Sequence, residues 1–293
     1  MENDFFYQVA GHCFRLSFSN DYFGKEGLNN YAPFLVSQRQ GEGYLFHLSV
    51  VDDLPNEDGY NLVGQFDNDA SSIGVFKSDS GAFRFRIALP GRTSFCTMDT
   101  DAAFRKAQVT LPSEDRFRFF GLNNCMMLLF AFSTANLDTL MMHASVIKNG
   151  ADGFMFLGKS GTGKSTHSRL WLEYIKGSEL LNDDNPVVRI VDGRAMVYGT
   201  PWSGKTPCYR NEEVLLKGIV KLQQAPRNQI KTLSLIQAYA IIFPACSGMR
   251  WEKGIASGIH QTVEKLICLV PSYRLECLPD KDAADLSAST IKE

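Results

Sequence analysis

The sequence predicts an α/β chain, α+β overall, in which a mostly β N-terminal domain over residues 1–120 precedes a second domain over residues 121–293. A chain of 293 residues has room for about two domains. Alternating and aromatic runs, separated by Gly, Asn, Asp and Ser, extend from Phe5 to about Leu111 and predict strands. At Gly121 the alternation gives way to a continuous apolar stretch, and later a buried strand leads through a glycine-rich loop into a helix.

The composition excludes several classes of protein. The chain is 44% hydrophobic and 21% charged, with 30 Lys and Arg against 32 Asp and Glu, which is typical of a globular protein and not of a disordered, collagen-like or coiled-coil chain. A net charge of −2 provides no general attraction to nucleic acid or anionic lipid, so we expect neither nucleic acid nor membrane as a partner. Any anion must therefore be held by a local group of residues.

Three features favour a cytoplasmic protein. The longest uninterrupted apolar run, Cys125–Phe132, is far shorter than the roughly 20 residues of a membrane span. The first residues, Met1–Phe6, are acidic where a signal peptide is basic. The seven cysteines are an odd number without a CxxC pair, which indicates reduced thiols and argues against a disulfide framework or a structural zinc site.

In the N-terminal domain we expect strands at Phe14–Phe18, Tyr44–Val51 and Phe83–Leu89. His12 and His47 fall within alternating strands, where a structural histidine is more common than a ligand. The ionisable residues of this domain form no recognisable spacing, so no chemistry is assigned to it.

The second domain begins with a largely buried helix over Leu122–Thr134. We expect the following strands: Leu140–Ile147, Phe154–Leu157, Glu179–Asn182, Val187–Val191, Ala195–Tyr198, Leu215–Leu222 and Tyr273–Leu278. We expect helices at Ser165–Lys176, Ser234–Ile242 and Ile255–Cys268 and, with a cap, from Asp280 onward. The stretches Gln223–Lys231 and Ser247–Gly258 are expected to be loops.

The segment Gly158-Lys-Ser-Gly-Thr-Gly-Lys-Ser165 matches G-x-x-x-x-G-K-[ST] at every fixed position, which predicts a phosphate-binding loop (P-loop, Walker A). Because it opens a helix, its backbone N–H groups and the positive helix N-terminus can surround phosphate oxygens. Lys164 is expected to bridge the outer phosphates, and the Ser165 hydroxyl is expected to bind Mg²⁺. The predicted nucleotide-binding residues are Gly158, Ser160, Gly161, Thr162, Gly163, Lys164, Ser165 and Thr166.

Two carboxylates, Asp183 and Asp184, follow the next predicted strand. Adjacent side chains at a strand end point in different directions, so one carboxylate can reach a metal while the other takes a proton from an incoming hydroxyl. A solvated turn is the alternative, because Asn-Asp-Asp-Asn-Pro is also favourable turn chemistry. His143, in the strand before the loop, is either structural or close to the phosphates. His167 is expected to face solvent or to pack.

Four segments, in this order, resemble the C-terminal domain of HPr kinase/phosphorylase and its HPr-kinase-like relatives. They are Leu140–Ile147, Phe156–Thr166, Leu180–Asp184 and Pro271–Asp280. The resemblance implies the P-loop fold of phosphoenolpyruvate carboxykinase, a mixed sheet with the nucleotide at one edge. It also implies a cytoplasmic ATP- and Mg²⁺-dependent kinase that acts on a serine-type hydroxyl. HPr kinases assemble as hexamers, so a homo-oligomer is left open.

By position in this resemblance, Asp183 matches the general base, Asp184 a carboxylate on the metal side, and His143 a histidine near the transferred phosphate. Two departures argue against HPr itself as the substrate. Thr166 stands where HPr kinases carry Glu, and Gly199–Lys205 replaces their Glu-Ile-Arg-Gly segment. This replacement resembles the Gly-Thr-Pro-Trp run of relatives that phosphorylate small molecules or modified peptides.

We therefore predict a kinase that transfers the γ-phosphoryl group of ATP to a hydroxyl of a protein, peptide or small molecule. Asp183, Lys164, His143 and Lys205 are its predicted catalytic residues, and Ser165 and Asp184 are its predicted metal ligands. Lys205, with Arg210 as an additional candidate, is expected to reach the transferred phosphoryl group, because cations stabilise its equatorial oxygens. Two alternatives stay open: a nucleotide-binding switch or accessory protein without phosphotransfer, and a carboxykinase-type enzyme.

Overall fold

The computed structural model describes residues 3–19, 28–37, 43–55, 59–67, 71–92, 95–204 and 206–292. The predicted α/β class is confirmed, because the described residues form two large mixed sheets and few helices. The chain divides into two compact units, Met1–Ser133 and Thr134–Glu293. The division lies at the C-terminal end of a helix, whereas the predicted boundary after residue 120 falls inside that helix.

In the described residues, the first unit is built on one sheet of nine strands. These are β1 (Asn3–Val9), β2 (His12–Phe18), β3 (Leu35–Val36), β4 (His47–Val50), β5 (Tyr60–Asp67), β6 (Ser72–Ser78), β7 (Phe83–Ala88), β8 (Phe95–Thr100) and β9 (Lys106–Thr110). Their order is β3-β1-β2-β4-β9-β8-β7-β6-β5. β4 runs parallel to both β2 and β9, and the other neighbours are antiparallel. A short 3-10 helix, η1 (Asn29–Phe34), precedes β3.

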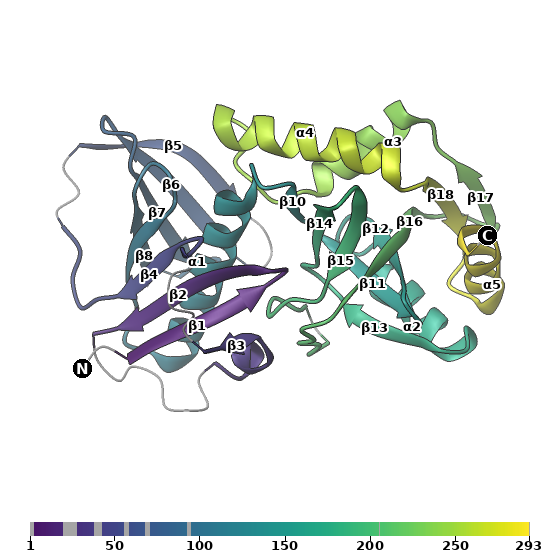
Figure 1. The fold of residues 1–293 in the computed structure, drawn as a ribbon, viewed down its shortest axis with the longest axis horizontal. Helices are drawn as coiled ribbons and strands as arrows, with labels where there is room; N and C mark the ends of the chain where they lie inside the picture. Colours follow the sequence, from purple (N-terminus) through teal and green to yellow (C-terminus); the bar gives the residue numbers. More distant parts are fainter. Residues whose placement is uncertain are drawn as a thin grey trace. The chain divides into compact units, whose positions relative to one another are not determined.

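One long helix, α1 (Asp115–Thr134), packs against this sheet. The ring of Phe130 lies 6.3 Å from Phe14 of β2, and the ring of Phe132 lies 5.8 Å from Phe85 of β7. Strands from both halves of the sheet therefore contact the same helix, around which the sheet curves (Figure 1). Gly121 does not begin the helix as the change of period suggested. It allows close packing on β8, since a Cβ there would lie 2.7 Å from Cys96 Cβ.

The second unit contains the other mixed sheet. Its strands are β10 (Thr139–Met141), β11 (Ala144–Asn149), β12 (Asp152–Leu157), β13 (Ser178–Asn182), β14 (Val187–Val191), β15 (Arg194–Tyr198), β16 (Glu213–Gln224), β17 (Gln229–Thr232) and β18 (Ser272–Cys277). The main order is β10-β14-β15-β16-β12-β11-β13, and β18 joins β16 to β17. β16 is parallel to β12 and β18, whereas the other pairs are antiparallel. The stretch Gln223–Lys231, expected to be a loop, contains the end of β16 and most of β17.

The helices of this unit are α2 (Lys164–Tyr174), α3 (Leu235–Ile242), α4 (Lys253–Leu269) and α5 (Lys281–Ile291), with a 3-10 turn, η2 (Phe243–Ala245), after α3. Ser234 caps α3 in a capping box with Gln237, and Asp280 caps α5 through the N–H of Ala283. α3 and α4 lie on the opposite side of the sheet from α2 (Figure 1). Gly258 of α4 fits closely against the start of the unit, because a Cβ there would lie 2.2 Å from the carbonyl oxygen of Ala135.

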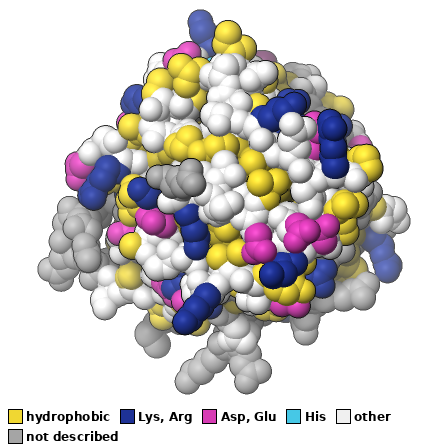
Figure 2. Space-filling view, turned by 90° about the vertical axis from the view of Figure 1, so that its right-hand side faces the viewer, with side chains coloured by type: hydrophobic (Ala, Val, Ile, Leu, Met, Phe, Trp, Pro, Cys, Tyr) yellow, Lys and Arg dark blue, Asp and Glu magenta, His cyan; other side chains and the backbone are white. Residues whose placement is uncertain are grey.

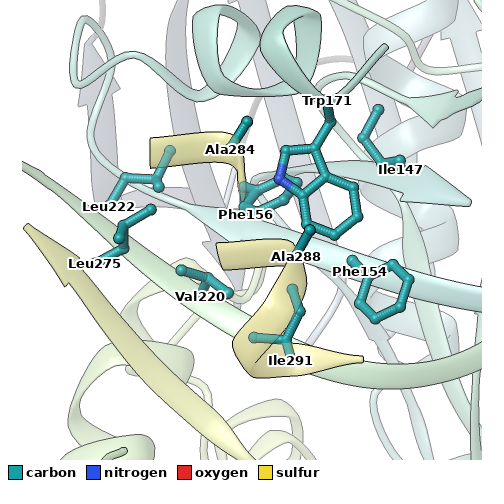
Figure 3. Close-up of a cluster of buried hydrophobic side chains, with 10 residues drawn as sticks. All are labelled: Ile147, Phe154, Phe156, Trp171, Val220, Leu222, Leu275, Ala284, Ala288 and Ile291. Carbon is teal, nitrogen blue, oxygen red and sulfur yellow. The ribbon is translucent and has the colours of Figure 1, made fainter. Parts of the chain in front are cut away.

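A buried cluster joins α2 and α5 to the sheet (Figure 3). Trp171 of α2 is fully buried, and its ring lies 5.1 Å from Phe154 and 5.5 Å from Phe156 of β12. The remaining members come from β11, β16, β18 and α5: Ile147, Val220, Leu222, Leu275, Ala284, Ala288 and Ile291. This packing holds α2, and hence the loop before it, in a defined position on β12.

One face of the molecule carries charges of both signs. Figure 2 shows basic and acidic side chains interspersed with small apolar areas on the side of the molecule that faces the viewer. Lys281 and Asp285 of α5, whose charged atoms lie 3.5 Å apart, are one such pair. In the part of the chain that the structure describes, no helix has both the length and the apolar character needed to cross a membrane.

Candidate active site

The topology of the second sheet brings the predicted segments to one edge. β11 is antiparallel to both β12 and β13, so β12 and β13 run in the same direction. The glycine-rich loop follows β12, the aspartate pair Asp183–Asp184 follows β13, and His143 directly precedes β11. Ala144 pairs with Leu157, the last residue of β12, which places His143 level with the start of the loop.

The loop between β12 and α2 has a backbone that favours glycine at two positions. Gly161 and Gly163 have φ values of 78° and 108°, and a Cβ at either would meet nothing within 4 Å. Their conformation, and not lack of space, therefore favours glycine. Gly163 is the N-cap of α2 and no side chain caps the helix, so the first-turn N–H groups can bind an anion. Ser160, Gly161 and Ser165 are exposed, and Thr162 and Thr166 are half-buried.

Lys164 begins α2 and points its amine back into the site. The residue is 8% exposed, and Nζ donates to the carbonyl oxygen of Gly158 at 3.0 Å and to His143 Nε2 at 2.9 Å. Burial lowers the pKa of Lys164, the Asp184 carboxylate opposes this shift, and the Lys221 amine adds to it. The amine is therefore partly desolvated, and its charged form is disfavoured by burial and favoured by the nearby Asp184 carboxylate.

A line of contacts joins this lysine to the aspartate pair. His143 Nδ1 lies 3.1 Å from Asp184 Oδ1, while His143 Nε2 accepts from Lys164. These contacts assign the proton of a neutral imidazole to Nδ1, from which it is donated to Asp184. Both His143 and Asp184 remain partly open to solvent, with 46% and 34% of their side chains exposed.

Backbone contacts explain the position of His143. The expected strand Leu140–Ile147 is interrupted there, and β10 and β11 are separate strands. The His143 N–H donates to Ala245 O at 2.7 Å, and the Met142 N–H donates to Pro186 O at 3.0 Å. The backbone thus leaves strand β10 before it enters strand β11, and His143 lies in the bend between the two strands.

Asn182 organises the turn that carries the aspartates. Its fully buried side-chain oxygen accepts the N–H groups of Asp184 and Asn185, both at 2.9 Å. Its amide donates to Thr200 Oγ1 at 3.0 Å. The Asn-Asp-Asp-Asn-Pro run therefore turns around the Asn182 side chain, but it is not the solvated turn of the alternative interpretation, because Asp183 is only 6% exposed. This turn directs the two carboxylates to different partners.

Asp183 is held by the segment that follows β15. The residue is 6% exposed. Asp183 Oδ1 accepts from Ser203 Oγ at 2.6 Å and from the Gly204 N–H at 2.7 Å, and Oδ2 accepts from the Thr206 N–H at 3.0 Å. A Cβ on Gly204 would lie 3.3 Å from both carboxylate oxygens, so glycine permits the close approach. No sequence pattern indicated these partners, although Ser203 and Gly204 lie within the unusual Gly199–Lys205 segment.

Of the two residues predicted to reach the transferred phosphoryl group, the structure describes Arg210 alone. Lys205 lies outside the described residues. Arg210 NH1 lies 2.7 Å from Glu179 Oε2 and 3.7 Å from Glu212 Oε1, and the hydrogen bond to Glu179 raises its pKa. Glu179 stands near the start of β13, whereas Asp183 follows its end. Arg210 is therefore engaged in ion pairs away from the aspartates, and the prediction that it reaches the phosphoryl group is not retained.

Further cations that the sequence did not single out flank the loop. Lys221 of β16 is level with Leu157 on one side and Arg274 of β18 on the other. Burial lowers the pKa of Lys221, and the charges of Lys159 and Arg274 lower it further. Only the pairing of distant parallel strands brings these residues together.

Two other histidines, His167 and His47, bond serine hydroxyls away from the aspartate pair. His167 of α2 is 3% exposed, with Nε2 3.1 Å from Ser287 Oγ and its ring 4.8 Å from that of Phe156. Burial lowers the pKa of His167 to about 4. In the first unit, His47 Nε2 lies 2.7 Å from Ser17 Oγ within the sheet.

Two side chains predicted to bind Mg²⁺ carry oxygen donors at this edge of the sheet. The Ser165 hydroxyl and the Asp184 carboxylate are oxygen ligands of the kind that Mg²⁺ prefers, and Asp184 keeps free lone pairs beside its bonds from His143 and Asn185. No group of three or more His, Cys, Asp or Glu side chains able to hold a metal by itself occurs among the described residues. Mg²⁺ bound here would therefore depend on phosphate oxygens for further ligands.

Neither a scan against protein-family models nor a search of curated proteins finds a match to this chain.

Proposed function

We propose that the chain is an ATP- and Mg²⁺-dependent kinase that transfers the γ-phosphoryl group to a serine-type hydroxyl of a protein, peptide or small molecule. The observation that carries this proposal is the line of contacts from Lys164 through His143 to Asp184. It joins a glycine-rich anion site to a carboxylate pair whose other member, Asp183, has separate partners. The resemblance to HPr-kinase-like proteins supports the same function.

The glycine-rich loop and the first turn of α2 provide the phosphate-binding site in this proposal. Backbone N–H groups and the helix dipole favour a polyphosphate, and Lys164 adds a cation. A bound polyphosphate favours the charged form of Lys164, against the burial that lowers its pKa. Lys221 and Arg274 place additional positive charge beside the loop.

Ser165 and Asp184 would hold Mg²⁺ together with phosphate oxygens. When bound, Mg²⁺ neutralises phosphate charge and polarises the phosphorus. His143 donates to Asp184 and accepts from Lys164, so it orients both the carboxylate and the amine. His143 is therefore a positioning residue in this proposal.

Asp183 is proposed to accept the proton of the acceptor hydroxyl. Two of its three hydrogen-bond donors are backbone N–H groups, which fix the carboxylate, and the third is the hydroxyl of Ser203. A base of this kind contributes about 10²–10⁴-fold to the rate.

The sheet supports the finer fold assignment that we propose, a phosphoenolpyruvate carboxykinase-like P-loop domain. β12 lies between antiparallel β11 and parallel β16, so the strand before the loop belongs to a mixed sheet and not to an all-parallel one. A mixed sheet with the nucleotide at one edge is what the family resemblance implies.

The test is calorimetric titration of the full chain with ATP, with and without Mg²⁺, with phosphate release followed in the same samples. We expect Mg²⁺-dependent binding that Lys164→Ala abolishes, because the variant removes the cation and leaves the loop glycines intact. Lys176→Ala, at an exposed lysine beyond the end of α2, is the matched control and should bind ATP as the parent does. Absence of ATP binding to the folded parent chain would refute the proposal, and nucleotide-dependent partner binding without transfer would favour a switch protein.

A further inference from the structure

A hydroxyl of the chain itself lies where an acceptor hydroxyl must lie, beside the proposed base. Ser203 Oγ is 2.6 Å from Asp183 Oδ1. The same oxygen is 2.7 Å from the carbonyl oxygen of Thr206, but its single proton can be given to only one acceptor at a time. The carboxylate is the stronger acceptor of the two because it is charged.

Among the described residues, three donors already occupy the Asp183 carboxylate. Asp183 is 6% exposed, and its other donors are the N–H groups of Gly204 and Thr206. Among the hydrogen bonds between described residues, Ser203 supplies the hydroxyl that reaches Asp183. Trp202, which precedes it, is 1% exposed and anchors the segment.

The same segment also lies close to the second carboxylate, that of Asp184. A Cβ on Gly204 would lie 3.0 Å from Asp184 Cβ. Asp184 contacts His143, which contacts Lys164 of the phosphate-binding loop. Ser203 is therefore adjacent both to the proposed base and to the residues that connect it with the proposed phosphate site.

We propose that Ser203 is an internal phosphoryl acceptor, so that the chain phosphorylates its own Ser203 within one molecule. This inference rests on the proposed kinase function. In the step, the Ser203 hydroxyl proton passes to Asp183 Oδ1 while Oγ forms a bond to the γ-phosphorus of ATP. The bond from that phosphorus to the β,γ-bridging oxygen breaks, and its electron pair leaves with ADP.

Phosphorylation of Ser203 would change the contact between Ser203 and Asp183. A phosphoserine carries a charge of about −1.5 to −2 at neutral pH, and it would stand beside the Asp183 carboxylate. Repulsion between these like charges separates the modified side chain from Asp183. The base is then accessible to the hydroxyl of an external acceptor.

The experiment treats the full chain with a phosphatase, removes the phosphatase, and adds Mg²⁺ and radiolabelled ATP. Incorporation is followed in time and the modified residue is identified by mass spectrometry. We expect one phosphate per chain, on Ser203, with a first-order rate constant that does not change over a tenfold range of protein concentration. ATP binding is measured by calorimetry on the same samples.

Four variants test whether Ser203 is the acceptor and Asp183 the base. Ser203→Ala should lose the label, and Ser203→Thr should carry it on the new hydroxyl. Asp183→Asn should slow labelling by about 10²–10⁴-fold. Ser289→Ala is the matched control, because it removes an exposed serine hydroxyl on α5, outside the site, and it should be labelled like the parent.

The failures of the two proposals are distinguishable. ATP binding and phosphate release without phosphate on Ser203 would overturn the internal acceptor and leave the kinase proposal standing. A rate constant that rises in proportion to protein concentration would overturn transfer within one molecule. Absence of ATP binding would overturn both proposals.

Discussion

The two units each contain a large mixed sheet, but their polar groups occupy different places. In the first unit they lie within strands and bond one another: Ser17 bonds His47, and Arg84, 3% exposed, bonds Asp99 at 2.6 Å. In the second unit the proposed site residues His143, Asp183 and Asp184 lie just outside strands, and His143 and Asp184 keep exposed surface. Polar groups inside a ladder are satisfied by their neighbours, whereas groups at strand ends keep bonding capacity for a ligand.

The largest expected effect concerns the carboxylates of the two units. Asp183→Asn should lower turnover by about 10²–10⁴-fold while ATP binding persists, because the change removes a base and not a phosphate contact. Steady-state kinetics with calorimetric titration checks this. Asp99→Asn in the first unit is the control: it should lower stability by weakening the pair with Arg84 and leave turnover per folded molecule unchanged. Full activity of Asp183→Asn would show that Asp183 is not the base.

The second prediction separates the cores of the two units. Phe14 is fully buried in the first unit, and Phe14→Ala should reduce the stability of this unit by about 3–5 kcal/mol. All three tryptophans, Trp171, Trp202 and Trp251, belong to the second unit. Tryptophan fluorescence therefore reports unfolding of that unit, and circular dichroism reports both.

If the units unfold independently, Phe14→Ala should lower the urea concentration at which circular dichroism records unfolding of the first unit. The transition that tryptophan fluorescence records should stay unchanged. Trp171→Ala provides the reverse test in the second unit. An equal shift of both signals in Phe14→Ala would show that the units unfold together. The difference between the two units would then not extend to their stability.

The third prediction concerns acid stability of the second unit. The pKa of His167 is about 4 in the folded chain and 6.5 as its ordinary value, so the unfolded chain binds the proton more readily. The contribution of neutral His167 to the free energy of unfolding is fully present above pH 6.5. It is lost as the pH falls from 6.5 through about 4, by about 3 kcal/mol in total. Urea unfolding followed by fluorescence from pH 7.5 to pH 4 measures the slope. His167→Gln should flatten it, and an unchanged slope in this variant would assign the pH dependence to other groups.

The smallest expected effect tests whether the polar cluster of the first unit has only a structural role. Ser17→Ala removes one hydrogen bond to His47 and should cost about 1 kcal/mol of stability. ATP binding and turnover should stay at the level of the parent. A loss of turnover beyond the loss of folded protein would place this cluster in the chemistry.

Local patterns in the sequence predicted much of the second unit. Val187–Val191 is a strand with the expected bounds, Ser234 and Asp280 cap their helices, and the glycine-rich loop joins a strand to a helix. Each of these features depends on residues close together in the chain.

Features that depend on distant segments were not predicted. The bend at His143 arises from bonds to Pro186 and Ala245, and β17 exists because it pairs with β18. The partners of Asp183 come from a segment about twenty residues away, whose Ser203 and Gly204 carry no local signal for that contact. The role of Gly121 in close packing of α1 on β8 also has no local signature, because it depends on Cys96 of a distant strand.

The residues Ile219–Lys221 of β16 have a further consequence for motion. They pair with β12 on one side and with β18 on the other, so both edges of this stretch are in ladders. Such amides exchange with deuterium only when the whole surrounding unit opens. Their exchange rates would therefore report the opening of the entire second unit, and a ligand at the β12 edge would slow them in proportion to its affinity for the closed state.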